Sequence, residues 1–259
     1  MTKNIAMIVK SRVENTPMTD AEWQARVNLA AVYRLAYQQG WDDLIYTHIT
    51  MRVPGSEEHF LINPFGLAFE EITASSLVKV DINGAVVGDS QSPVNMGGFT
   101  IHSAVHAARH EVNCVMHLHI NAGIAISMLK CGLLDLCQHA MLFHNRIGYH
   151  DYEGPALDLD ERKRLIANLG QHNALILRNH GLLTAGKTVG EAFVRMSYLV
   201  RACETQLLAM SSGAELNIAP PELAEQTARI HEGDALPLGD REWPAMLRRL
   251  DRDLPGYRN

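Results

Sequence analysis

The sequence is poor in cysteine, and its few thiols form no recognisable framework. Only four cysteines occur among 259 residues, and each stands in an apolar or helical setting without the paired spacing of a metal site. They are Cys114, Cys131, Cys137 and Cys203. Isolated thiols of this kind are typical of packed, reduced cysteines in the cytoplasm. We therefore predict a cytoplasmic protein without a disulfide scaffold.

Long apolar runs and an excess of basic residues are also missing. No stretch approaches the roughly 18 apolar residues that span a bilayer. Residues 1–5 do not lead into the apolar core of a secretory signal, so we expect no signal peptide. The formal net charge is −6 and no basic patch dominates, which argues against nucleic acid or an anionic membrane as the main partner. We expect a small-molecule substrate instead.

The remaining composition is that of an ordinary globular protein. Hydrophobic residues make up 47% and charged residues 20% of the chain, and its length can bury a sizeable core. Hairpin signals, of which Asn83-Gly84 is the strongest, alternate with inserted helices. This mixture favours an α/β or α+β domain over a regular βαβ series. We predict one domain over 1–259, with a core at 20–212, an N-terminal arm at 1–19 and a C-terminal arm at 213–259 at a subunit contact.

Hydrophobic periodicity locates the main elements. The patterns predict helices over 20–39, 99–108, 158–169 and 189–210, and strands over 46–53, 59–62, 77–81, 85–87, 114–119 and 174–177. Thr19-Asp20-Ala21-Glu22 is a capping box that should begin the first helix, and Gly40 should end it.

Histidine, in contrast to cysteine, is abundant in this sequence. The chain has 13 histidines, and most of them fall between His102 and His180. His117 and His119 occupy positions i and i+2 of the strand at 114–119, so both point to one face, about 7 Å apart along the backbone. His180 closely follows the strand at 174–177. Three imidazoles at the ends of buried strands suit one divalent metal ion.

A packed core is the competing interpretation of these histidines. An isolated His-x-His pair more often belongs to a core than to a metal, and adding His180 makes the two interpretations equally well supported. His102 and His106 stand four residues apart on the helix at 99–108. His102 either orients a metal ligand or packs on the sheet. For His106 we favour packing, because no glutamate or third ligand completes a His-x-x-x-His site.

Several short motifs together resemble one family. They are Asn63-Pro64-Phe65-Gly66, the run Ile72-Thr73-Ala74-Ser75-Ser76-Leu77-Val78-Lys79-Val80-Asp81, His117-Leu118-His119, and Arg178-Asn179-His180-Gly181. Over residues 20–212 the chain resembles the class II aldolase/adducin family, and within it the adducin-like branch.

The resemblance implies a fold, an assembly and a metal. The family has a three-layer α/β/α fold around a central, mostly antiparallel sheet and commonly forms a cyclic homotetramer. Its sugar-phosphate aldolases and epimerases bind zinc or a similar ion through residues that match His117, His119 and His180. The expected cofactor is therefore a divalent metal, zinc first, with manganese or iron as alternatives. In the aldolases this ion polarises a carbonyl and stabilises the enediolate that carbon–carbon cleavage leaves.

The chain departs from the aldolases at the residues that handle protons and phosphate. Gly98 occupies the position of their proton-transfer carboxylate and cannot give or take a proton. Met96 and Gly97 replace the serines that would hold a phosphate, and Thr47-His48 replaces the family's Gly-Asn turn. We therefore expect a non-phosphorylated substrate.

Three functions remain open on the sequence alone. The first is a metal-dependent lyase, performing retro-aldol cleavage or decarboxylation on a small substrate that can bear a carboxylate. His48, His102 and His139 are then the candidate catalytic residues, with Tyr149 or Tyr152 as alternative proton carriers, also across a subunit boundary. The second is a non-catalytic adducin-like binding domain that keeps the metal site. The third is an iron-dependent oxygenase, since three imidazoles leave coordination positions open.

Overall fold

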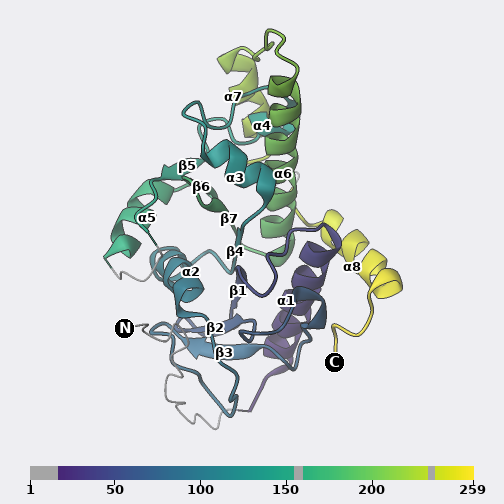
Figure 1. The fold of residues 1–259 in the computed structure, drawn as a ribbon. Coiled ribbons are helices and arrows are strands. Elements are labelled where there is room, and N and C mark those ends of the chain that lie inside the picture. Colours follow the sequence, from purple (N-terminus) through teal and green to yellow (C-terminus); the bar gives the residue numbers. More distant parts are fainter. Residues whose placement is uncertain (1–16, 155–159, 233–236) are drawn as a thin grey trace.

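A seven-stranded sheet runs through the centre of the chain. The computed structural model describes residues 17–154, 160–232 and 237–259 (Figure 1). The strands are β1 (His48–Arg52), β2 (His59–Ile62), β3 (Val78–Asp81), β4 (Cys114–Leu118), β5 (Gly148–His150), β6 (Ala174–Leu177) and β7 (Gly181–Gly186). Their order is β3-β2-β1-β4-β7-β6-β5. The β5–β6 pair is parallel and the other pairs are antiparallel.

Helices cover both faces of this sheet. The α-helices are α1 (Asp20–Gln38), α2 (Met96–Ala108), α3 (Asn121–Ser127), α4 (Gln138–Met141), α5 (Glu161–Leu169), α6 (Val189–Ser211), α7 (Pro221–Ile230) and α8 (Glu242–Asp253), and a short 3-10 helix η1 spans Phe69–Glu71. Figure 1 shows α2 and α5 on one side of the sheet and α1, α3 and α6 on the other. The three-layer α/β/α architecture with a mostly antiparallel sheet is therefore confirmed.

The alternation of side chains along the central strands places the histidines on one face. Met116 and Leu118 of β4 join the core cluster that includes α1 and α6, whereas Val115 joins the cluster of α2 and α5. Because neighbouring residues of a strand point to opposite faces, His117 shares the side of Val115. His48 lies directly opposite His117 in the β1–β4 ladder, so its side chain projects toward the α2 layer as well.

The start of α1 differs in one detail from the predicted capping box. The Thr19 side chain accepts a hydrogen bond from the Glu22 amide at 3.1 Å, as expected. The Glu22 carboxylate does not reach back to the cap, however. It is buried and pairs with Arg26 at 3.0 Å and Lys79 at 2.9 Å. Two cations satisfy this carboxylate better than one amide, because ion pairing offsets its desolvation.

Helix α2 begins three residues earlier than the periodicity predicts. Asn95 caps the helix, and its side chain accepts a hydrogen bond from the Gly97 amide at 3.0 Å. Glycine lowers helix propensity, so Gly97 and Gly98 conceal the first turn in the sequence. The tertiary structure thus brings Gly98 onto a helix.

The hairpin at Asn83-Gly84 is only partly formed. Its turn is held by the Asp81 carboxylate, which accepts hydrogen bonds from the Asn83 and Ala85 amides at 2.8 and 2.9 Å. The predicted returning strand at 85–87 reduces to an isolated bridge between Val80 and Val86.

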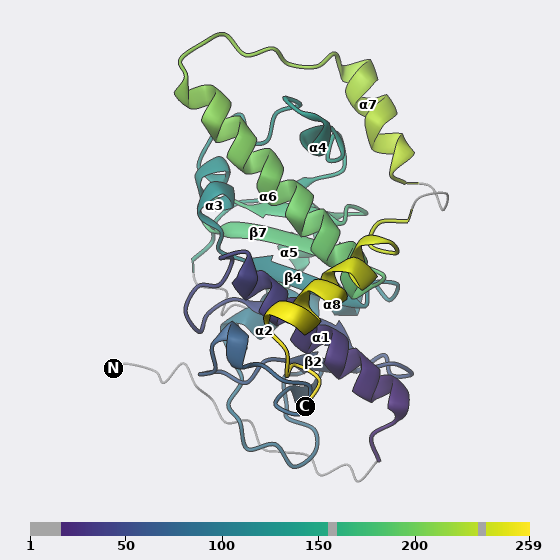
Figure 2. The ribbon, with the colours of Figure 1, turned by 90° about the vertical axis from the view of Figure 1, so that its right-hand side faces the viewer.

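The end of the chain packs back on the core. Figure 2 shows α8 lying across α1, and the Tyr257 carbonyl accepts a hydrogen bond from the Ala74 amide at 2.9 Å. Tyr257 itself is fully buried. The arm boundaries and a subunit contact through 213–259 stay predictions, and residues 1–16 of the predicted N-terminal arm lie outside the described residues. Within the described ranges, no helix has the length and apolar character to cross a membrane.

Candidate metal centre

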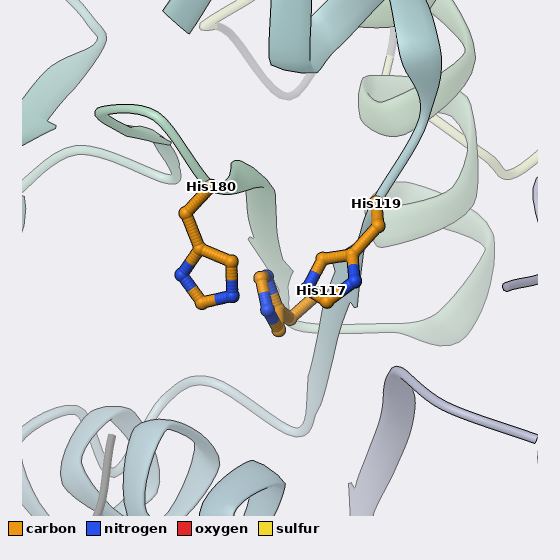
Figure 3. A group of neighbouring side chains, drawn as sticks. All are labelled: His117, His119 and His180. Atoms are coloured by element: carbon orange, nitrogen blue, oxygen red, sulfur yellow. The ribbon is translucent and has the colours of Figure 1, made fainter. Parts of the chain in front are cut away.

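Three histidines converge at the end of the central strands. His117 lies near the end of β4, His119 follows it, and His180 lies in the turn that joins β6 to β7. One ring nitrogen from each comes within 4.8 Å of the others. The ring centroids are separated by 4.8 to 5.1 Å. Figure 3 shows the three rings gathered around a common space.

Hydrogen bonds fix which nitrogen two of these rings present. His117 Nδ1 lies 3.0 Å from the Leu182 carbonyl oxygen, and His119 Nδ1 lies 2.9 Å from Oδ2 of Asp43. Both oxygens only accept, so each Nδ1 carries the proton and each Nε2 keeps a free lone pair. Among the described residues, the buried His119 Nε2 has no hydrogen-bond partner. This donor set fits a divalent metal ion, since an imidazole oriented by an outer carboxylate or carbonyl is a typical ligand.

The backbone around His180 is shaped for the approach of the third ring. Asn179 has φ +56°, a left-handed conformation that turns the chain sharply between β6 and β7. A Cβ atom on Gly181 would lie 2.7 Å from the Leu118 carbonyl oxygen. Glycine is required there because β7 passes directly beside the His-x-His strand.

Burial keeps two of the three imidazoles, those of His117 and His180, neutral. Desolvation is the main cause that places the pKa of His117 well below its usual 6.5, and the neighbouring histidines lower it further. Desolvation, followed by the proximity of His119, lowers the pKa of His180 to about 4. Neutral imidazole is the form that binds a metal, so at neutral pH these two side chains are ready to coordinate one.

An open cleft of about 540 Å³ lies over the three histidines. Besides the triad, it is lined by residues that include Asp43, His48, Gly98, Ile101, Tyr152 and Asn179. None of its lining residues in the described part of the chain is lysine or arginine. The cleft therefore offers no cationic side chain to a phosphate group.

His48 occupies the space that a side chain at position 98 would need. A Cβ atom on Gly98 would lie 1.8 Å from Cδ2 of His48. The ring is held by Nδ1, which lies 2.8 Å from Oδ1 of Asn63. Desolvation lowers the pKa of His48 to about 4. The side-chain space at position 98 is thus filled by a neutral imidazole from β1.

The structure brings only part of the predicted catalytic set to the cleft. His48 and Tyr152 line it. His102 is fully buried behind the lining, with its ring 6.4 Å from those of His48 and His117. His139 is not brought to the cleft of its own chain. It lies on α4 and packs 5.0 Å from the ring of Tyr198 on α6.

Tyr149 also contacts residues that do not line the cleft. Its hydroxyl accepts a hydrogen bond from the Leu133 amide at 3.0 Å, and the Arg178 guanidinium lies over its ring.

Sequence reasoning missed the residues that orient the histidines. Asp43 holds His119, Asn63 holds His48, and Thr50 contacts His102 at 2.8 Å. Asp43 comes from the loop between α1 and β1, 76 residues before His119. No local pattern marks such a partner, because the contact depends on how a distant loop crosses the strand ends.

Because His106 is buried, we expect the folded protein to lose stability in acid. Desolvation and then the nearby Arg52 charge lower its pKa from 6.5 to about 3. Between these values the unfolded chain binds a proton that the folded chain does not, so the free energy of unfolding should decrease as the pH falls. One such site contributes at most about 1.4 kcal/mol per pH unit. Denaturant unfolding across this range should show a shallower pH dependence for His106→Gln. His110→Gln, at an exposed side chain, should keep the original slope, and an equal slope for both variants would contradict the expectation.

The layers, the strand-end histidines and the cleft define an α/β protein built around a candidate three-histidine metal centre. The family model of the Class II Aldolase and Adducin N-terminal domain matches residues 27–207. The chain belongs to this family.

Individual relatives include both class 2 aldolases and adducins. The chain is 52% identical to a Caulobacter vibrioides protein described under aldolase class 2, over 93% of this chain and 94% of that one. It is 44% identical to rat alpha-adducin over 90% of this chain but only 33% of that protein.

Solved structures agree with this assignment. An aldolase II superfamily protein from Pseudomonas syringae matches with a TM-score of 0.88 and 48% identity, covering 93% of this chain and 98% of that one. The L-fuculose 1-phosphate aldolase from Glaciozyma antarctica matches with a TM-score of 0.79 and 29% identity, covering 93% and 97% of the two chains.

Proposed function

We propose that this protein is a metal-dependent carbon–carbon lyase that acts on a small, non-phosphorylated substrate by retro-aldol cleavage or decarboxylation. The observation that carries the proposal is the convergence of His117, His119 and His180 at an open cleft, with two of their Nδ1 atoms bonded to acceptors. In this proposal the triad holds one divalent ion, zinc first and manganese or iron as alternatives. When bound, such an ion polarises a carbonyl oxygen of the substrate.

In this proposal, side chains of the protein remove and return the protons. His48 lines the cleft, and its Nε2 is free to accept because Nδ1 is bonded to Asn63. We assign His48 the removal of the hydroxyl proton that precedes cleavage of a β-hydroxy carbonyl compound. We assign the return of a proton to the carbon fragment to Tyr152, which lies at the cleft beside His180. His102 acts behind them as a positioning residue.

The absence of cations among the described lining residues supports a non-phosphorylated substrate. Phosphate recognition normally uses arginine, lysine or a set of free backbone amides. At the start of α2, the Gly97 amide is already bonded to Asn95. With no cationic side chain among the described lining residues, a substrate carboxylate would have to bind to the metal ion itself. A β-hydroxy keto acid could bind in this way.

Surface residues and the free thiols support proposals for the assembly and the location. Leu44, Tyr46 and Tyr152 are large apolar or aromatic residues with 74%, 46% and 54% exposure at or near the cleft. Exposed apolar side chains close together favour a protein contact, and we propose the homotetramer of the family. All four cysteines are free, which supports a reducing, cytoplasmic location.

Zinc-loaded protein and a panel of unphosphorylated β-hydroxy ketones and β-hydroxy keto acids test the lyase proposal. We expect about one metal equivalent per chain and turnover that chelation abolishes and zinc restores. His48→Asn should keep the metal yet lose activity by about 100-fold or more, as for loss of a general base. Activity that survives chelation would contradict the proposal.

The similarity to alpha-adducin supports a second candidate, a binding domain without turnover. This candidate predicts the same metal content but no cleavage of any compound in the panel. Metal retention without activity in both the parent protein and His48→Asn would therefore favour the binding domain.

A further inference from the structure

Tyr152 lies at the cleft on a short segment, 150–154, that continues from the end of β5. Its side chain is 54% exposed, and its ring centroid lies 6.1 Å from that of His180. An exposed side chain exchanges between rotamers within picoseconds to nanoseconds unless its surroundings restrict it. The position of the Tyr152 ring therefore depends on how the backbone of this segment is held.

The buried His150 anchors the segment on one side. Its carbonyl oxygen accepts a hydrogen bond from the Arg178 amide at 2.8 Å, which ties the end of β5 to the turn between β6 and β7. Its Nδ1 lies 2.8 Å from Oδ1 of Asn168, and its Nε2 lies 3.4 Å from Oε1 of Glu161. Both of these partners belong to α5. His150 thus joins the strand, the turn and the helix.

An ion pair with the same helix anchors the segment on the other side. Nε of Arg164 donates to both carboxylate oxygens of Glu153, at 2.8 and 2.9 Å, and a terminal guanidinium nitrogen also contacts Oε2. The hydrogen bonds from Arg164 hold the pKa of Glu153 below its usual range, so the carboxylate is charged at neutral pH. A pair with two parallel bonds fixes orientation as well as distance.

These contacts come from one face of a firmly packed helix. Glu161, Arg164 and Asn168 stand at positions i, i+3 and i+7 of α5, which places them along one side. Leu165 is buried in the cluster that includes residues of α2. A Cβ atom on Gly148 would lie only 2.3 Å from the Asn168 carbonyl oxygen, so β5 and α5 approach as closely as glycine allows. The helix is therefore a fixed support for the segment.

We propose that Glu153 and Arg164 form a clamp that positions Tyr152 over the cleft, with His150 as the second fixed point. Tyr152 stands between the two anchored residues, so its backbone is constrained from both sides. A proton carrier must come within hydrogen-bond reach of the atom it serves, and a displacement of about 1 Å can cost about 100-fold in rate. Glu153 and Arg164 do not line the cleft and act through Tyr152. The clamp rests on the proposed function only in the role that Tyr152 has there.

Fluorine NMR of metal-free protein labelled with 3-fluorotyrosine tests the clamp without measuring turnover. Tyr152→Phe identifies the Tyr152 signal among those of the seven tyrosines. We expect this signal to be displaced from the value in an unstructured peptide, because the ring lies beside the His180 ring. Arg164→Gln should move it toward the peptide value. Lys163→Gln, which removes the neighbouring cation from an exposed pair on the same helix, should leave it in place. An unchanged signal in Arg164→Gln, or an equal change in Lys163→Gln, would overturn the proposal.

Charge reversal separates positioning from a general loss of stability. Exposed ion pairs contribute little to folding, so Arg164→Gln should lower Tm by no more than about 2–4 °C. Arg164→Glu should displace the Tyr152 signal by placing two like charges together, and the double variant Glu153→Arg/Arg164→Glu should restore it. A double variant whose signal stays displaced would refute the ion pair as the cause, and so would a loss of Tm far above this range.

Turnover supplies a second readout if the parent protein cleaves a compound of the panel. Arg164→Gln should then lower kcat by up to about 100-fold with little change in KM, because the triad and His48 stay in place. A change confined to KM would contradict a positioning role. A Tyr152 signal that responds in a protein without turnover would refute only the lyase, and turnover with an unresponsive signal would refute only the clamp.

Discussion

His180→Gln is expected to remove bound metal from the protein. The triad brings one nitrogen of each ring within 4.8 Å of the others, and two ligands from a single strand hold an ion far less firmly than three converging ones. Loss of an outer partner alone typically weakens metal affinity about 10- to 100-fold, so loss of a ligand should exceed 100-fold. Zinc competition titration, with metal analysis after gel filtration, measures the effect.

Two further variants test the same expectation, one with a smaller expected loss of zinc affinity and one with none. Asp43→Asn leaves the ligands in place but replaces the acceptor that fixes the His119 tautomer. It should therefore weaken zinc binding by about 10- to 100-fold, between the parent protein and His180→Gln. His110→Gln removes a histidine outside the cleft and should retain one equivalent. If His180→Gln also retained one equivalent with unchanged affinity, His180 would not be a ligand.

Gly98→Ala is expected to destabilise the fold although it replaces glycine within a helix. The new Cβ would stand 1.8 Å from Cδ2 of His48, and His48 is buried and bonded to Asn63. Neither the helix backbone nor the ring can move away cheaply in a packed interior. Overpacking of this kind costs about 1–3 kcal/mol, to be measured as the free energy of unfolding in denaturant.

The effect of Gly98→Ala on the free energy of unfolding should change sign once the His48 ring is removed. In a His48→Ala background the space beside position 98 is open, and alanine should gain about 0.5–1 kcal/mol from its higher helix propensity. The double-mutant cycle should thus report a coupling of about 1.5–4 kcal/mol between the two positions. An equal effect of Gly98→Ala in both backgrounds would mean that His48 does not fill this space.

The sequence, together with the family motifs that it contains, predicted the architecture and the grouping of His117, His119 and His180. Two-residue periodicity places His117 and His119 on one face of a strand wherever that strand lies. The hydrophobic periods and the family motifs together predicted the layers, and the sheet order and registers agree with them. Errors occurred where local propensity and tertiary context disagree, as at Gly97 and Gly98 in the first turn of α2.

Only the tertiary structure determined how the candidate site is arranged. His48 and Gly98 are 50 residues apart in the sequence, and nothing local indicates that the ring of one fills the side-chain space of the other. Asp43, Asn63 and Thr50 acquire their roles by hydrogen bonding to rings on other elements. Ring tautomers depend on what each Nδ1 meets in space. Sequence periodicity therefore determined which histidines share a face, and long-range packing decided which nitrogen each one presents and to what.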